Sequence, residues 1–156
     1  MPAASSSEMI TFFRDLCLAP FPFREDFIRG MEANIHGFVR DRTKRAPWRW
    51  DNGRFQLDYI TEAMAGGSVP APQCAVIATI ADDPDHLTLA RSIDSKLLIG
   101  KGKSSGRRGR NTTTWTVDSG ENTRFRVFFK SEPQGRERLK ARLIVMQLPD
   151  YAIEQE

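Results

Sequence analysis

Apolar and polar residues alternate along two segments near the C-terminal end of the chain, 123–130 (TRFRVFFK) and 137–147 (ERLKARLIVMQ). Side chains on a strand point alternately to its two faces, so each segment predicts a strand with one apolar and one basic face. Segment 112–118 (TTTWTVD) alternates too and is rich in β-branched residues. Turn-forming residues at 119–122 and 131–136 separate the three segments. The pattern predicts an antiparallel three-strand meander.

The apolar face of this meander must be buried against other elements of the fold. Segments 8–18 and 23–42 carry apolar side chains at helical spacing, which predicts two helices in the N-terminal part of the chain. The expected fold class is therefore α+β, with N-terminal helices packed on one face of a mostly antiparallel sheet and a C-terminal three-strand meander. The residues expected on the covered face are Trp115, Val117, Phe125, Val127, Phe129, Leu139, Leu143 and Val145.

The middle of the chain is less regular. Segment 73–80 (QCAVIATI) is nearly all apolar and predicts a strand buried on both sides. Segment 55–64 fits a strand or a helix, and we favour the helix. Segment 87–93 fits a helix capped by the acidic residues before it or a hairpin strand, and we favour the strand. Segment 43–53 is expected to be a basic, aromatic loop.

Length and composition indicate one domain. The chain has 156 residues, of which 40% are hydrophobic and 28% charged. These values are ordinary for a soluble globular protein and sufficient for a real core. We expect a single domain over 1–156, with 1–7 flexible and 100–111 forming a flexible basic loop. The sequence shows no internal repeat.

The cysteines and the N-terminus favour an intracellular protein, cytoplasmic or nuclear, over a secreted one. Cys17 and Cys74 are too few and too widely spaced for a disulfide scaffold or a structural zinc site, and we expect both to be reduced. The first ten residues do not have the pattern of a secretory signal. No apolar segment reaches the roughly 20 residues of a membrane-spanning helix, so no membrane partner is expected.

The net charge is only +3, but the charges are unevenly distributed. Segments 40–49 and 101–110 together hold 10 of the 23 basic residues and 1 of the 20 acidic residues. The second segment leads into the meander, whose basic residues share one face. Like charges opposite each other on neighbouring strands are destabilising by up to roughly 1 kcal/mol per pair. A face of this kind is expected to meet a negative partner.

Basic segments bind phosphate backbones by charge and counterion release. Phe128 falls on the basic face, where a base or sugar would cover it. Trp48 and Trp50 are further stacking candidates, although tryptophans at this spacing more often pack in a core. The predicted nucleic-acid-binding residues are Lys101, Lys103, Arg107, Arg108, Arg110, Arg124, Arg126, Phe128, Lys130, Arg138, Lys140, Arg142, Trp48 and Trp50.

The function expected from this pattern is non-enzymatic nucleic-acid binding. RNA or single-stranded DNA is favoured over sequence-specific duplex DNA, because no predicted helix has the basic composition of a recognition helix. The alternative is a protein-interaction or assembly module, such as an inhibitor or structural subunit. It would bind an acidic protein partner with the same face, or form a homo-oligomer through Ile144 and Met146.

No catalytic residue, cofactor or metal site is predicted. The Gly-Lys-Ser tripeptide at 102–104 lacks the first glycine of a nucleotide-binding P-loop, because that position is Leu97. The tetrapeptide HLTL at 86–89 resembles the His-hydrophobic-Thr-hydrophobic element of 2H phosphoesterases. Those enzymes need two such elements, and the second histidine of this chain, His36, has no threonine two residues later. We interpret the acidic residues at 82–85 as a solvated turn.

Overall fold

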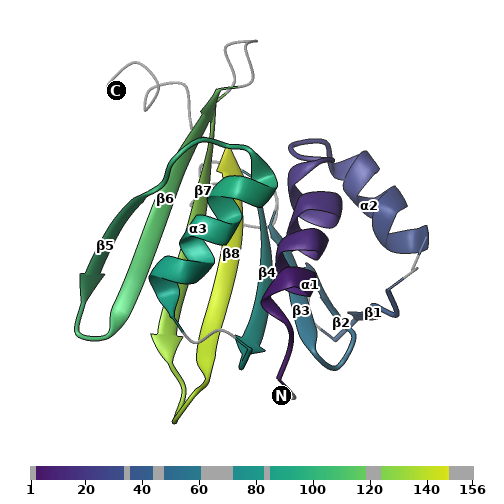
Figure 1. Cartoon of the computed structure of the whole chain (residues 1–156). Coiled ribbons are helices and arrows are strands. Elements are labelled where there is room, and N and C mark those ends of the chain that lie inside the picture. The colour runs from purple at the N-terminus through teal and green to yellow at the C-terminus, as the bar shows by residue number, and fades with distance from the viewer. Residues whose placement is uncertain are drawn as a thin grey trace.

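The protein is an eight-stranded antiparallel sheet with helices over one face (Figure 1). The computed structural model describes residues 3–33, 36–43, 48–60, 72–82, 85–118 and 124–147. The α+β class expected from the sequence is confirmed, as are the N-terminal helices and the C-terminal meander. None of the helices in the described ranges combines the length and the hydropathy that crossing a bilayer requires.

The N-terminal half contains α1 (Ser6–Phe12), its π-helical continuation η1 (Phe13–Leu18), α2 (Arg24–Ala33), β1 (Val39–Asp41), β2 (Trp48–Asp51), β3 (Phe55–Ile60) and β4 (Gln73–Ile80). The C-terminal half contains α3 (His86–Leu97), β5 (Lys103–Arg107), β6 (Arg110–Asp118), β7 (Arg124–Pro133) and β8 (Leu139–Gln147). Each half of the chain therefore consists of helical segments followed by a four-strand meander. The sequence does not reveal this repeated topology. The strand order β1-β2-β3-β4-β8-β7-β6-β5 joins the halves through β4 and β8.

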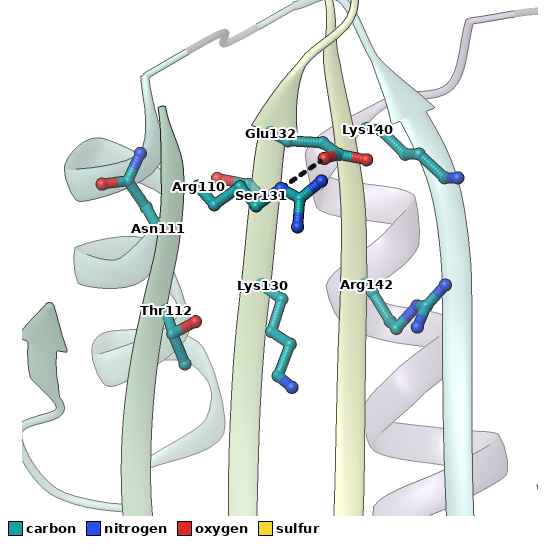
Figure 2. Close-up of a pocket in the computed structure, with 8 residues that line it drawn as sticks. All are labelled: Arg110, Asn111, Thr112, Lys130, Ser131, Glu132, Lys140 and Arg142. Atoms are coloured by element: carbon teal, nitrogen blue, oxygen red, sulfur yellow. Dashed lines mark ion pairs between the residues drawn. The ribbon is translucent and has the colours of Figure 1, made fainter. Parts of the chain in front are cut away.

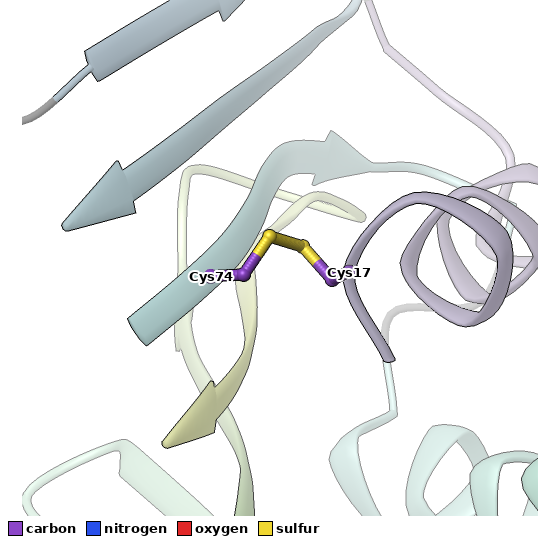
Figure 3. Close-up of a disulfide and its surroundings, with 2 residues drawn as sticks. All are labelled: Cys17 and Cys74. Carbon is purple, nitrogen blue, oxygen red and sulfur yellow. A yellow bond between two sulfur atoms is a disulfide. The ribbon is translucent and has the colours of Figure 1, made fainter. Parts of the chain in front are cut away.

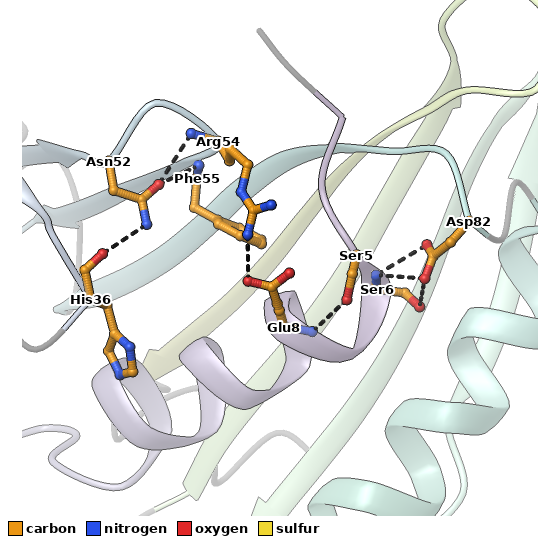
Figure 4. A network of polar contacts seen from close by, with 8 residues as sticks. All are labelled: Ser5, Ser6, Glu8, His36, Asn52, Arg54, Phe55 and Asp82. Carbon is orange, nitrogen blue, oxygen red and sulfur yellow. Dashed lines mark hydrogen bonds and ion pairs between the residues drawn. The ribbon is translucent and has the colours of Figure 1, made fainter.

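Polar contacts hold the start of α1 against the sheet (Figure 4). The hydroxyl of Ser5 caps the helix by accepting a hydrogen bond from the backbone N–H of Glu8 at 3.0 Å. Asp82, just after β4, accepts hydrogen bonds from the backbone N–H and the hydroxyl of Ser6. Arg54, between β2 and β3, forms an ion pair with Glu8 at 2.6 Å. The segment predicted to be flexible therefore contains the cap and first residues of a helix.

A disulfide joins Cys17 of η1 to Cys74 of β4 across the interface between helix and sheet, with the Cα atoms 5.5 Å apart (Figure 3). The prediction of two reduced cysteines is corrected, because η1 packs on β4 and closes the 57-residue separation. Closing such a loop stabilises a fold by about 4 kcal/mol in the chain-entropy model. Disulfides persist mainly in oxidising compartments, so this one gives no support to the predicted intracellular location, which stays a prediction.

The core lies between the helices and the facing side of the sheet. Phe27 of α2 stacks on Tyr59 with ring centroids 4.2 Å apart, and Trp115 of β6 donates a hydrogen bond to Asp94 of α3 at 2.5 Å. The predicted covered face is confirmed: Val117 is partly buried, and the other members are buried.

Two segments predicted as helix contain strands. The helix expected over 23–42 is α2 alone, which ends at Ala33. Gly37 has a φ of +74°, which is not helical, and β1 follows. The helix expected over 55–64 is wrong for 55–60, which form β3, and the rest lies outside the described residues. In β3 the side chains alternate between buried and half-buried, since Phe55, Leu57 and Tyr59 face the core.

The strand favoured over 87–93 is wrong, and the helical alternative is the observed one. The carboxylate of Asp85 accepts hydrogen bonds from the backbone N–H of Thr88 at 3.2 Å and from its hydroxyl at 2.6 Å, and so caps α3. Leu89, Ile93 and Leu97 then recur at helical spacing on the buried side. The strand predicted over 73–80 is confirmed as β4, although three of its side chains on the uncovered face, those of Gln73, Ala75 and Ile77, are half-buried rather than fully buried.

The basic loop predicted over 100–111 is wrong, because most of it is a β-hairpin. β5 and β6 are joined by Arg108 and Gly109, whose φ values of +55° and +79° match a two-residue type I′ turn. Part of the predicted loop over 43–53 is likewise β2. The turn expected over 119–122 lies outside the described residues, and β7 continues to Pro133, into the turn expected over 131–136.

Candidate functional site

The sheet face away from the helices is called the open face here. On β6, Thr113 and Trp115 contact α3, so Thr112, Thr114 and Thr116 point to the open face. The same alternation places Arg126, Phe128 and Lys130 of β7 there, since Phe129 stacks on His86 of α3. On β8 the open-face residues are Lys140, Arg142, Ile144 and Met146.

A hollow of about 400 Å³ lies in this face over β6, β7 and β8 (Figure 2). Figure 2 shows its cations arising from three adjacent strands, and we call it the cationic hollow. Among its lining residues Glu132 is the one carboxylate. The lining consists of Arg110, Asn111, Thr112, Lys130, Ser131, Glu132, Lys140 and Arg142.

Strand register arranges these charges in two rows. In one row Glu132 lies opposite Lys140 and forms an exposed ion pair with Arg110 at 3.5 Å. In the next row Lys130 lies directly opposite Arg142. The outer neighbours of that pair are Thr112 on β6 and Ile77 on β4, which are uncharged. Glu132 therefore offsets the first row, whereas the second row places two cations face to face.

The β5–β6 hairpin continues the positive surface to the edge of the sheet. Arg107 lies directly opposite Arg110, a second pair of like charges, and Arg108 is exposed at the turn. A further hollow of about 760 Å³ beside the hairpin shares Arg110 and Thr112 with the cationic hollow. Lys103 faces Thr114 near the start of the hairpin. The cations of the hairpin and of β7–β8 therefore belong to one continuous surface.

Phe128 lies one row beyond Lys130, between Thr114 and Ile144 on the neighbouring strands. Its ring is half-buried, and the Nζ of Lys130 lies 5.6 Å from the ring centroid. Ile144 is itself only 9% exposed. The apolar residues at the centre of the open face are therefore largely covered by their neighbours.

The remaining predicted cations lie further from the cationic hollow. Arg126 is opposite Thr116 and Met146, and Arg124 is opposite Asp118. Lys101 precedes β5 and Arg138 precedes β8, and both side chains are exposed. The structure thus brings four predicted cations together in the lining of the cationic hollow: Arg110, Lys130, Lys140 and Arg142. The side chains outside this lining are those of Lys101, Arg124, Arg126 and Arg138.

Trp48 and Trp50 lie away from the cationic hollow, on the helix-covered face, where the guanidinium of Arg40 lies over both rings. Trp50 is opposite Leu57 and packs edge-on against Phe27, and Trp48 stacks on Tyr59. Trp50 is 7% exposed. Trp50 therefore has the core packing that was also considered, whereas Trp48 is half-buried and its stacking on a base stays a prediction.

His86 is a core residue beneath the same strands. Its Nδ1 is 2.6 Å from the hydroxyl of Ser131, and its Nε2 is 2.8 Å from the hydroxyl of Thr113. Burial lowers the pKa of His86, and the charge of Asp85 opposes that shift. A buried ring without solvent access gives no support to the phosphoesterase resemblance. Within the described parts of the chain, no group of three metal-ligating side chains occurs.

Glu132 is not among the residues predicted from the sequence, because the turn-forming residues from 131 onward predict the end of the strand. The alternation of β7 in fact continues to Pro133, with Ser131 buried and Glu132 half-buried on the open face. This continued alternation is the sequence signal that could have placed Glu132 on the open face.

Comparison with known proteins identifies no family. No protein-family model matches the chain, and no curated protein matches it in sequence. Among solved structures, the human StarD13 (DLC2) lipid transfer and protein localization domain is similar over 79% of this chain and 80% of its own. The TM-score is 0.33 and the identity 10%, a likeness too distant to bear on function.

Proposed function

We propose that this protein binds nucleic acid without catalysis, through the open face of its sheet, with RNA or single-stranded DNA as the ligand. The observation that carries the proposal is the direct opposition of Lys130 and Arg142 at the cationic hollow. Facing cations are unfavourable in the free protein. A phosphate between them removes the repulsion and gains charge-assisted hydrogen bonds.

The spacing of the strands suits this role. Neighbouring strands lie about 5 Å apart, so one phosphate reaches side chains on both β7 and β8. The hydroxyl of Thr112 beside Lys130 offers a further donor to the same group. Arg110 and Lys140 extend the positive surface in the next row, where Glu132 forms an ion pair with Arg110 and lies opposite Lys140.

Phe128 favours a single strand over a duplex. Its ring lies one row from Lys130, whose ammonium group currently lies over it. When Lys130 moves to a phosphate, the ring becomes available to an unpaired base, and such a stack contributes roughly 1–3 kcal/mol. Bases in a duplex are already stacked and cannot reach it.

The β5–β6 hairpin adds contacts to the backbone of the nucleic acid. Its cations are exposed and lie at the edge of the sheet, where a strand leaving the cationic hollow would pass. Contacts of this kind add affinity without sequence preference and make binding depend on salt.

A binding screen tests the proposal. Fluorescence anisotropy at low salt would compare labelled RNA, single-stranded DNA and duplex DNA of equal length and mixed sequence. We expect single strands to bind more tightly than the duplex, and Arg142→Gln to weaken the binding. Arg91→Gln is the matched control, because Arg91 is exposed on α3, on the other side of the sheet. No detectable binding, together with a clean oligomer in solution, would instead favour an assembly module.

A further inference from the structure

The other half of the open face has different chemistry. A second hollow of about 300 Å³ lies over β2, β3, β4 and β8, and Arg142 lines both this hollow and the cationic one. Much of its lining is apolar, from Ile60, Ala75, Ile77 and Ile144. Because its polar side chains include two glutamines, we call it the amide hollow. Its volume is at the lower end for small-molecule sites, which span roughly 300–1,000 Å³.

Three polar side chains of the amide hollow, Arg49, Gln56 and Asp58, hold one another in orientation. Arg49 forms a two-point ion pair with Asp58, with Nε–Oδ1 at 2.8 Å and Nη2–Oδ2 at 3.0 Å. The side-chain amide of Gln56 donates to the carboxylate of Asp58 at 3.3 Å. An ionised carboxylate only accepts hydrogen bonds, so the amide nitrogen of Gln56 must face Asp58 and its oxygen stays available.

Gln73 completes the set. It lies on β4 opposite Met146 and Ile60, and its side chain is half-buried at the hollow. Its amide makes no hydrogen bond to any residue in the described ranges. It therefore presents an adjacent donor and acceptor at the wall of a largely apolar hollow.

We propose that the amide hollow is a nucleobase subsite that favours adenine. The proposal rests on the nucleic-acid binding proposed above, with Lys130 and Arg142 holding the phosphate. The apolar lining contacts the face of the base, and the amide of Gln73 pairs with its edge. A glutamine amide matches the adjacent donor and acceptor of adenine.

The same groups disfavour guanine and cytosine. Guanine is usually read by an arginine fork, but the fork of Arg49 is engaged by Asp58. Cytosine is read by a carboxylate acceptor, but Asp58 already accepts hydrogen bonds from Arg49 and Gln56. The recognition groups that remain are the amide of Gln73 and the side-chain oxygen of Gln56.

The position of the amide hollow relative to the phosphate fits one nucleotide. Arg142, Ile77 and Gln56 are consecutive in one row across β8, β4 and β3. Two strand spacings of about 5 Å therefore separate the phosphate-binding arginine from the amide of Gln56. Gln73 lies on β4 four residues from Ile77, so roughly 14 Å separate its Cα from that of Arg142. The side chains of Arg142 and Gln73 both line the amide hollow and shorten this distance toward the reach of a nucleotide from its phosphate to the edge of its base.

The test compares oligo(A), oligo(C) and oligo(U) of equal length on the full chain. We expect oligo(A) to bind roughly tenfold more tightly than oligo(U). Gln73→Leu should remove this preference and leave the salt dependence of binding unchanged. Thr116→Val, an exposed open-face residue outside both hollows, is the matched control and should retain it.

A second variant keeps the test decisive if Gln73→Leu does not fold. Gln73→Glu preserves size and replaces the amide by an acceptor, so the preference should move toward oligo(C). Salt-dependent binding with equal affinity for all three oligomers would overturn the adenine subsite alone. Absence of binding to every oligomer would overturn the proposed function as well, so the two failures are distinguishable.

Discussion

Lys130 and Arg142 occupy directly opposite positions on β7 and β8, with uncharged neighbours on both sides of the row. Two like charges so placed on adjacent strands destabilise a sheet by roughly 0.2–1 kcal/mol. Lys140, in contrast, lies opposite Glu132, so the same pair of strands also contains a complementary pairing. The free protein thus carries a local electrostatic cost at the site where we propose that phosphate binds.

Removing one cation of this pair should stabilise the ligand-free protein and weaken its binding of nucleic acid. Lys130→Gln is expected to raise the free energy of unfolding of the ligand-free protein by a few tenths to about 1 kcal/mol, because the repulsion is gone. The gain should shrink at high salt, which screens exposed charges. Urea unfolding at two salt concentrations measures it, with Arg91→Gln as control. A loss of stability at low salt would contradict the repulsion.

The turn of the β5–β6 hairpin allows a charge to be removed without disturbing the backbone. Arg108 has a positive φ of +55°, a conformation that asparagine tolerates better than arginine. Arg108→Asn should therefore maintain or raise the melting temperature. It should also flatten the plot of log affinity against log salt by about 0.7 if Arg108 contacts one phosphate. An unchanged slope would exclude the hairpin tip from the interface.

Gly102 marks a close approach between the segment before β5 and the core. A Cβ atom at this position would lie 2.6 Å from Cε2 and 2.8 Å from Nε1 of Trp115. The backbone N–H of Gly102 and the indole of Trp115 both donate to the carboxylate of Asp94. Gly102→Ala should therefore lower the free energy of unfolding by about 1–3 kcal/mol.

A second glycine provides the control for that substitution. Gly30 lies in α2, and a methyl group added there would have no neighbour within 4 Å, so Gly30→Ala should raise stability by up to about 1 kcal/mol. Urea unfolding measures both variants. Similar changes in the free energy of unfolding for Gly102→Ala and Gly30→Ala would show that the space beside Trp115 can accommodate a methyl group.

His86 should make stability depend on pH. Burial lowers its pKa below the ordinary value of about 6.5, so between the two values the unfolded chain binds a proton that the folded chain does not. The free energy of unfolding should therefore be greatest above about pH 6.5 and fall as the pH decreases through this window. His86→Gln should flatten this dependence in urea unfolding between about pH 5 and 7.5. Identical pH dependence in both proteins would contradict the assignment.

The sequence was sufficient for the C-terminal meander, because alternation there coincides with β-branched and aromatic residues. It was insufficient for α3, where Leu87, Leu89 and Ile93 fit both a strand and a helix, and the cap formed by Asp85 and Thr88 decides between them. The disulfide could not be anticipated, because spacing alone does not show that η1 packs on β4.

The candidate site also contains residues whose positions could be predicted from the sequence and residues whose positions could not. Alternation correctly placed Lys130 and Arg142 on one face, since that inference needs only a period of two. It could not show which face of β2 the helices cover, and this requires the pairing of Trp50 with Leu57. The amide hollow was out of reach because the sequence pattern of β3, which carries Gln56 and Asp58, also fits a helix.

The salt dependence of RNA binding is the sharpest test of whether the open face binds the backbone of a nucleic acid. Affinity for a mixed-sequence single-stranded RNA would be measured over a range of salt for the unmodified protein, Lys130→Gln/Arg142→Gln and Arg91→Gln. We expect log affinity to fall linearly with log salt. The double variant should flatten the slope by about 1.4, and Arg91→Gln should leave it unchanged. Binding that is absent at low salt, or equal slopes for all three proteins, would contradict binding through the open face.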